Sequence, residues 1–137
     1  MEIDRDPPKS KRGPEDWFTG EVWMEEIASP PAPARIQALS VRFTPGARTA
    51  WHRHPFGQVL HVTEGEGRAQ RKGGPVEVIR PGDRISFEPG EEHWHGAAPA
   101  TGMTHLALQE ADEDRVPTYW GEHVADDDYL AEPAGPA

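Results

Sequence analysis

The chain has 137 residues, which gives room for one folded domain and not for a second of ordinary size. Its formal net charge is −10 with histidine neutral, so its field repels nucleic acid phosphates and anionic lipid head groups. We therefore expect no nucleic acid and no membrane partner. The chain has no cysteine, which excludes disulfides, thiolate metal ligands and a cysteine nucleophile.

The two ends of the chain lack the apolar residues needed to offset the entropy lost on ordering. Residues 1–14 are charged and contain proline, and residues 131–137 are rich in alanine, proline and glycine. We expect both ends to be flexible, with one barrel domain over residues 15–130. Residues 1–14 also lack the apolar run of a signal peptide or membrane anchor, which favours a cytoplasmic location.

Between these ends, short apolar or alternating runs are separated by turn sequences such as Pro81-Gly82-Asp83 and Pro89-Gly90-Glu91. This spacing predicts an all-β sandwich or barrel. The predicted strands are Glu21–Ile27, Ile36–Phe43, Thr49–His54, Gln58–Thr63, Arg68–Arg71, Val76–Ile79, Arg84–Phe87, His93–Ala97 and Met103–Glu110.

No helical period of any length occurs before residue 110. After it, we predict one or two short helical turns in the stretch that contains Tyr119, Trp120, Val124 and Tyr129, with Asp126 as the N-cap.

The segment from Trp51 to Gln58 contains a pattern suited to metal binding. Side chains at positions i and i+2 of a strand point to the same face, so His52 and His54 present their imidazoles side by side. Pro55 and Gly57 bend the chain after them. The bend lets Gln58 open the next strand and return its side-chain oxygen to the same face as a third ligand.

A fourth ligand follows in a second stretch, where a tight turn, Pro89 to Glu92, holds His93 at the mouth of a strand. A lone His-x-His pair is more often structural than ligating, so the prediction depends on the combination of all four side chains. Together they predict one divalent metal ion per chain. Manganese, iron, nickel, zinc and cobalt all accept such ligands, so these residues alone do not select one.

These residues resemble the two motifs of the cupin family, Gly-x5-His-x-His-x3-4-Glu-x6-Gly and Gly-x5-Pro-x-Gly-x2-His-x3-Asn. The glycines are Gly46, Gly65, Gly82 and Gly90, and every spacing is met. Three residues differ from the pattern: Gln58 at the glutamate position, Glu88 at the first proline and Ala97 at the asparagine. The resemblance implies a single-domain cupin, a jelly-roll-like double-stranded β-helix.

A longer resemblance, from about residue 14 to about residue 130, is to the bacterial cupin hydroxynitrile lyases. It is carried by the segments 16–20, 45–52, 90–99 and 103–107. The resemblance implies that His52, His54, Gln58 and His93 hold manganese and that His105 is a pocket histidine. It also implies reversible cleavage of a small-molecule cyanohydrin, such as (R)-mandelonitrile, to an aldehyde and hydrogen cyanide.

His105 shares a strand face with Gln109, and we assign both to the catalytic site. His105 is expected to act as general base and acid, and Gln109 to anchor the substrate or orient His105. From its residue type alone, His105 is as readily a buried histidine bonded to backbone, and Gln109 a strand-end residue that reaches water. His95, which has the same parity as His93, is expected to support the site rather than to bind the metal.

Two alternatives use the same barrel, because function depends on the site and not on the fold. One is a small metal-dependent cupin oxygenase, and the other is a cupin that binds a metal or metabolite without turnover. The neutral ligand set argues against the oxygenase, since it stabilises a higher oxidation state less than a carboxylate would. We also expect a homodimer or homotetramer, with Trp17–Ile27 adding a strand across a subunit boundary.

Overall fold

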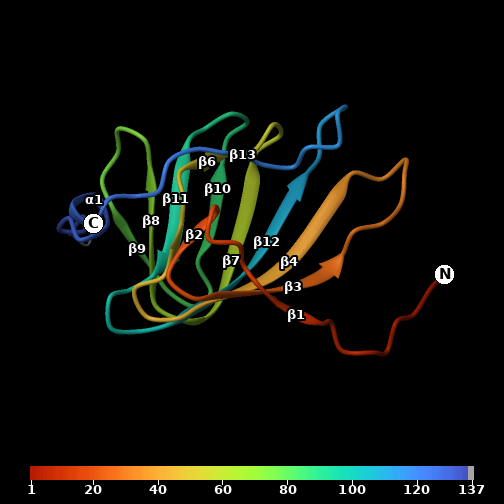
Figure 1. Cartoon of the computed structure of the whole chain (residues 1–137), viewed down its shortest axis with the longest axis horizontal. Coiled ribbons are helices and arrows are strands. Elements are labelled where there is room, and N and C mark those ends of the chain that lie inside the picture. Colours follow the sequence, from red (N-terminus) through yellow and green to blue (C-terminus); the bar gives the residue numbers. More distant parts are fainter. Residues whose placement is uncertain (136–137) are drawn as a thin grey trace.

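The computed structural model describes residues 1–135, which form two curled β-sheets that face each other (Figure 1). The first sheet has the strand order β1-β3-β4-β12-β7-β10. Its strands are β1 (Ser10–Arg12), β3 (Val22–Ala28), β4 (Ile36–Phe43), β12 (Met103–Glu110), β7 (Gln58–Gly65) and β10 (Arg84–Phe87).

The second sheet has the order β13-β6-β11-β5-β2, and β8 pairs with both β11 and β9. Its strands are β13 (Tyr119–Trp120), β6 (His52–Arg53), β11 (His93–Ala97), β5 (Arg48–Thr49), β2 (Phe18–Thr19), β8 (Gly67–Arg71) and β9 (Glu77–Ile79). All strand pairs in both sheets are antiparallel, as the predicted all-β barrel with short turns requires.

Alternation along the strands places the core between the sheets. In β7, Gln58, Leu60 and Val62 are buried while Val59 and His61 are exposed, and β12 alternates in the same way. The outward position predicted for His61 is therefore confirmed. The apolar core joins inward residues of both sheets, including Val41, Phe43, Leu60, Val62, Phe87, Met103 and Ala107.

Four predicted strands have the observed bounds: β4, β10, β11 and β12. The predicted strand Thr49–His54 was wrong as one unit, because it divides into β5 and β6 on either side of Ala50 and Trp51. Both pieces pair with β11, so the break bends the chain without removing it from the sheet.

The N-terminal segment was predicted to be flexible throughout, and this is wrong for Ser10–Arg12. These residues form β1, which pairs with β3 from Ser10 opposite Glu25 to Arg12 opposite Trp23. Their side chains are exposed, so the pairing depends on backbone hydrogen bonds, which do not require an apolar sequence.

The single helical turn, α1 (Asp126–Tyr129), begins one residue earlier than an Asp126 N-cap would allow. The N-cap is Ala125, and Asp126 is the first helical residue. The other predicted helical residues, Tyr119 and Trp120, form β13 instead, because they pair with Arg53 and His52. The helical prediction from scattered aromatic residues was therefore wrong at this short strand.

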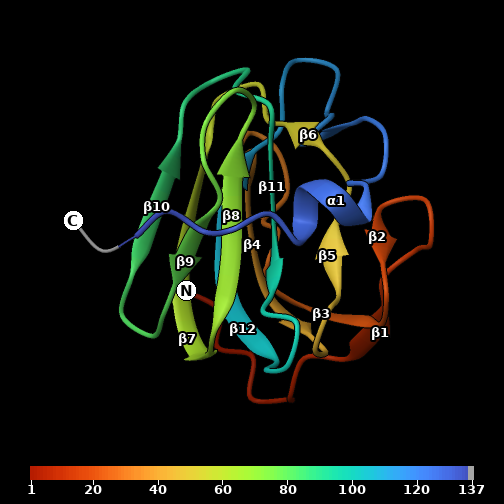
Figure 2. The same cartoon turned by 90° about the vertical axis from the view of Figure 1, so that its left-hand side faces the viewer.

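The segment after α1 runs across β8 and β9 (Figure 2), where the Ala134 amide donates to the Val76 carbonyl at 2.8 Å. Of the tail predicted to be flexible, residues 136 and 137 lie outside the described residues. Within residues 1–135, no helix has the length and apolar character that crossing a membrane requires.

Candidate metal centre

Two neighbouring strands of the second sheet bring the first imidazoles together. His52 on β6 stands directly opposite His93 on β11, and their ring centroids are 4.3 Å apart. His54 follows β6, with its ring centroid 5.0 Å from that of His52 and 5.5 Å from that of His93. All three side chains are buried. The structure therefore gathers three of the four predicted metal ligands at one point inside the barrel.

The turn at Gly57 brings the fourth predicted ligand to the same point. Gly57 has φ +83°, and a Cβ atom there would lie 2.4 Å from the carbonyl oxygen of Phe87, so only glycine fits. The Gly57 amide donates to the His54 carbonyl at 3.2 Å. Gln58 then opens β7 opposite Phe87, with its side chain 6% exposed.

Backbone carbonyls fix the orientation of the three ligand imidazoles. The Nδ1 atoms of His52, His54 and His93 lie 2.9, 2.8 and 2.8 Å from the carbonyl oxygens of residues 50, 117 and 91 respectively. A carbonyl only accepts, so each Nδ1 carries the ring proton and each Nε2 keeps a free lone pair. This is the tautomer that a metal ion requires.

The electrostatics of the site favour neutral imidazoles. Burial lowers the pKa of His93 to about 3, and burial together with the neighbouring His93 holds the pKa of His52 well below its usual value. Burial also lowers the pKa of His54 and that of His95. At neutral pH these rings are therefore uncharged, so no proton competes with a cation for their lone pairs.

One short contact joins the fourth predicted ligand to the histidines. Gln58 Oε1 lies 3.0 Å from His93 Nε2, and both atoms are acceptors once His93 carries its proton on Nδ1. Two ligands about 2.1 Å from a divalent ion, at right angles around it, are separated by about 3 Å. In addition, the buried Nε2 atom of His54 has no hydrogen-bond partner among the described residues. These residues therefore fit a bound divalent metal.

A fourth histidine, His95, also reaches this cluster. One ring nitrogen from each of His52, His93 and His95 lies within 4.8 Å of the other two, so these three buried histidines could hold a metal ion. The sequence predicted a supporting role for His95 and ligation by His54. Geometry alone thus offers two histidine sets that share His52 and His93, and the predicted ligand set stays a prediction.

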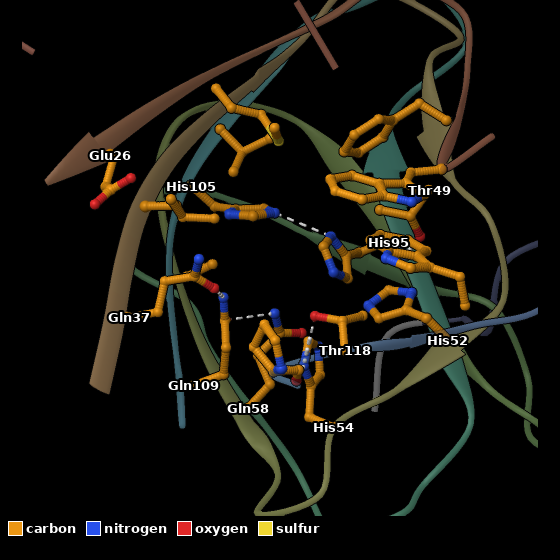
Figure 3. Close-up of a pocket in the computed structure, with 18 of the residues that line it drawn as sticks. Glu26, Gln37, Thr49, His52, His54, Gln58, His95, His105, Gln109 and Thr118 are labelled. Atoms are coloured by element: carbon orange, nitrogen blue, oxygen red, sulfur yellow. Dashed lines mark hydrogen bonds between the residues drawn. The ribbon is translucent and has the colours of Figure 1, made fainter. Parts of the chain in front are cut away.

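His105 lies next to His95 and not in the ligand cluster (Figure 3). His105 Nε2 is 2.9 Å from His95 Nδ1, and Phe43 packs on both rings, with centroids 5.3 and 5.9 Å away. Burial lowers the pKa of His105 to about 4, so the ring is neutral at physiological pH. Its Nδ1 atom is buried without a hydrogen-bond partner among the described residues.

The other predicted catalytic residue, Gln109, is buried beside Gln58. Gln58 Nε2 donates to Gln109 Oε1 at 3.0 Å, and Gln109 Nε2 donates to Gln37 Oε1 at 2.7 Å. The sequence analysis missed Gln37. The signal for it was present, because Gln37, Leu39 and Val41 have the same parity on one strand.

A cavity of about 380 Å³ opens onto this cluster. Ala107 and Leu39 give it apolar walls, while His52, His54, Gln58, His95, His105 and Gln109 form its polar end. Its aromatic wall comes from both ends of the domain, since Trp17 stacks on Trp120 with centroids 5.1 Å apart. Neither tryptophan was predicted as a pocket residue, because no local pattern links positions about 100 apart.

A small apolar cluster packs against the reverse face of the strands that carry His52 and His93. Trp94 is fully buried against Val76, Val124 and Tyr129, and Trp51 packs at its edge. The prediction that Trp51 and Trp94 support the ligand strands from the opposite face is therefore confirmed.

Comparison with known proteins agrees with this geometry. A family model described as a cupin domain matches residues 39–106, a range that includes all four predicted ligands. The (R)-mandelonitrile lyase of Granulicella tundricola is 55% identical over 130 residues, which cover 94% of this chain and 98% of that protein. This chain belongs to the cupin hydroxynitrile lyase family.

Solved structures place this cupin among the same barrels. A cupin-like protein from Thermotoga maritima is 34% identical, with a TM-score of 0.85 over 98% of this chain and 100% of that chain. A polyketide cyclase from Streptomyces resistomycificus is 20% identical, with a TM-score of 0.73 over 94% and 89%. At that identity the second likeness shows the fold alone, so function rests on the site.

Proposed function

We propose that this cupin is a metal-dependent lyase that reversibly cleaves cyanohydrins such as (R)-mandelonitrile to an aldehyde and hydrogen cyanide. The observation that carries the proposal is a neutral, buried histidine, His105, on the wall of the same cavity as the candidate metal cluster. The identity to an (R)-mandelonitrile lyase over nearly the whole chain supports it.

We assign His52, His54, Gln58 and His93 as the metal ligands and manganese as the metal. When bound, the metal supplies a Lewis acid that stabilises alkoxide or cyanide charge. Because the four ligands are uncharged, they leave the positive charge of a divalent ion uncancelled. A glutamate in place of Gln58 would neutralise part of that charge.

A role for His105 as the base requires this ligand set rather than one that contains His95. Each neutral imidazole carries one proton, and one proton joins His95 Nδ1 to His105 Nε2. If His95 bound a metal through Nε2, its proton would stand on Nδ1, and His105 would be left with a protonated Nδ1. If His105 donates instead, its Nδ1 atom has a free lone pair. Only the second arrangement makes His105 a base toward the cavity.

In the proposed reaction, His105 Nδ1 accepts the hydroxyl proton of the cyanohydrin. The oxygen–hydrogen electron pair forms the carbonyl double bond, and the bond from carbon to the nitrile breaks with its electron pair leaving as cyanide. His105 then returns the proton to cyanide, which gives hydrogen cyanide and regenerates the base. Of the two roles expected for Gln109, anchoring the substrate fits its place in the cavity wall, because its amide bonds Gln58 and Gln37 and not His105.

The cavity suits an aryl substituent. Trp17, Phe18, Phe43 and Trp120 line it, together with apolar side chains from β4 and β12. Aromatic walls bind a phenyl ring by stacking and by removing its apolar surface from water. A volume of about 380 Å³ is within the range of small-molecule sites.

The proposal is tested by measuring cyanide release from (R)-mandelonitrile with metal-stripped protein and with protein reloaded with manganese. We expect release only after reloading, at equal rates with and without oxygen. Oxygen consumption with flavonoid or diketone substrates would instead identify an oxygenase. Manganese binding without turnover of any cyanohydrin would identify a binding protein. Either of these results would overturn the proposed function.

A further inference from the structure

Three glutamines form one row across the inner face of the first sheet. Gln109 on β12 stands in register with Gln37 on β4 and with Gln58 on β7. Gln109 Nε2 donates to Gln37 Oε1 at 2.7 Å, and Gln58 Nε2 donates to Gln109 Oε1 at 3.0 Å (Figure 3). The row ends at Gln58 Oε1, which lies 3.0 Å from His93 Nε2.

This row has a direction, because each carboxamide has one donating end and one accepting end. If Gln37 turned its NH2 group toward Gln109, the Gln109 carboxamide would have to turn over to accept the bond. Gln58 would then have to turn as well, and its NH2 group would face His93. An amide NH2 group has no lone pair for a metal ion, so the Gln37 end of the row decides whether Gln58 is a ligand.

Burial requires each donating end in the row to meet an accepting end. Gln58 and Gln109 are each 6% exposed, so an unpaired amide there would lose hydrogen bonds without recovering them from water. Gln37 is only half-buried. We propose that Gln37 is a positioning residue whose accepting oxygen sets the direction of the row and thereby turns the Gln58 oxygen toward the metal. This inference rests on the metal site of the proposed function.

Three substitutions of Gln37 test whether its accepting oxygen sets the direction of the row. Gln37→Glu keeps an acceptor, so we expect manganese affinity within about threefold of wild type. Gln37→Leu removes the acceptor and leaves the direction unset. Gln37→Lys offers only donors, which forces the row to turn over, and we expect its manganese affinity to fall by about 10-fold to 100-fold, the range seen when residues behind metal ligands are changed. Gln37→Leu should lie between Gln37→Glu and Gln37→Lys.

A matched control measures how much the added positive charge of Gln37→Lys changes manganese affinity by itself. Glu26 lines the same cavity but has no place in the row, and Glu26→Gln changes the charge by the same amount as Gln37→Lys. We expect Glu26→Gln to change manganese affinity by less than threefold. Repeating both titrations at 1 M salt screens the charge effect, whereas the effect of a turned-over row persists.

The measurement is titration with manganese, read from the electron paramagnetic resonance signal of the free ion, on metal-stripped variants with wild-type circular dichroism spectra. A manganese affinity that falls from Gln37→Glu to Gln37→Leu to Gln37→Lys, with little change in Glu26→Gln, supports the role of Gln37. Equal affinities at position 37, or a Glu26→Gln loss as large as that of Gln37→Lys, would overturn it. Wild type that binds no manganese would instead refute the metal site itself.

Discussion

At the scale of residues, His54 and His95 compete for one role. The Nε2 atoms of His54 and His95 are both buried without a partner among the described residues, and His95 also belongs to the group of three close histidines and is bonded to His105. A neutral imidazole can use each nitrogen only once: the protonated nitrogen donates, and the other accepts a hydrogen bond or binds a metal. We propose ligation by His54 and control of the His105 tautomer by His95.

Two alanine variants test this division of roles. We expect His54→Ala to lower manganese affinity by at least about tenfold, because it removes a ligand. His95→Ala should keep its metal and lose most cyanohydrin cleavage, since His105 is no longer held in the basic tautomer. Metal content by elemental analysis and cyanide release distinguish them. A His95→Ala protein that loses manganese as severely as His54→Ala would move the ligand role to His95.

The buried histidines also predict how the metal-free protein responds to acid. The pKa is about 4 for His105 and about 3 for His93, both below the ordinary value, because burial disfavours the charged ring. As the pH falls below 6.5, the unfolded chain takes up protons that the folded protein does not, so the free energy of unfolding falls. Between pH 7 and pH 5 we expect a loss of about 2 kcal/mol for each of these two rings.

Urea unfolding of metal-free protein at several pH values measures this slope. A free energy of unfolding that stays constant from pH 7 to pH 5 would show that these rings are not held neutral by the fold.

At the scale of elements, part of the site could be predicted because three of its residues lie close in sequence, whereas His93 and His105 lie on later strands. Strand alternation and turns bounded by glycine and proline place His52, His54 and Gln58 on one side of the barrel. The same reasoning places His105 and Gln109 on one face of β12, as observed. Strand alternation shows that a histidine points inward, but not whether it binds a metal or a neighbouring side chain. The contact of His95 with His105 was therefore not predictable.

The missed elements depend on distant partners. The two-residue strands β2 and β13 exist because they pair with β5 and β6, and two residues carry no periodic signal. The strand β1 is exposed and charged, so its composition resembles that of a flexible end. These elements also supply part of the cavity wall, including Phe18 and Trp120. The pocket shape was therefore the least predictable part of the site.

The turn before β7 should be the most sensitive element of the site. Gly57 and Gly73 both have φ +83°, but a Cβ atom at Gly57 meets the Phe87 carbonyl, whereas Gly73 has nothing within 4 Å. We expect Gly73→Ala to cost about 1 kcal/mol of stability, the cost of the left-handed conformation. Gly57→Ala should cost about 1–3 kcal/mol more and weaken manganese binding. Equal losses in urea unfolding would contradict this explanation of the turn.

At the scale of the whole molecule, the first sheet exposes an apolar outer face. Ile36, Val59 and Leu108 are 47%, 41% and 41% exposed on neighbouring strands, and Phe56 is 52% exposed beside them. They line one shallow hollow. Within Trp17–Ile27, β3 is paired on both sides and β2 lies at the end of the second sheet, so we expect this apolar face to make the main contact between subunits together with the edge of β2.

Sedimentation velocity at micromolar concentration tests the expected homodimer or homotetramer. Wild type should sediment as an oligomer, and Leu108→Asp should shift it toward a monomer by placing a charge in the apolar contact. Leu130→Asp is the control, because Leu130 is 59% exposed and follows α1, outside the first sheet. A compact wild-type monomer of 15.2 kDa would contradict the expectation.

The central claim is that His105 moves the substrate proton beside a metal that other residues hold. The most direct measurement is cyanide release from (R)-mandelonitrile by wild type and His105→Ala at equal measured manganese content. We expect His105→Ala to keep its manganese and to lose at least about 100-fold in turnover, the lower range for a general base. Equal turnover per manganese in the two proteins would contradict it.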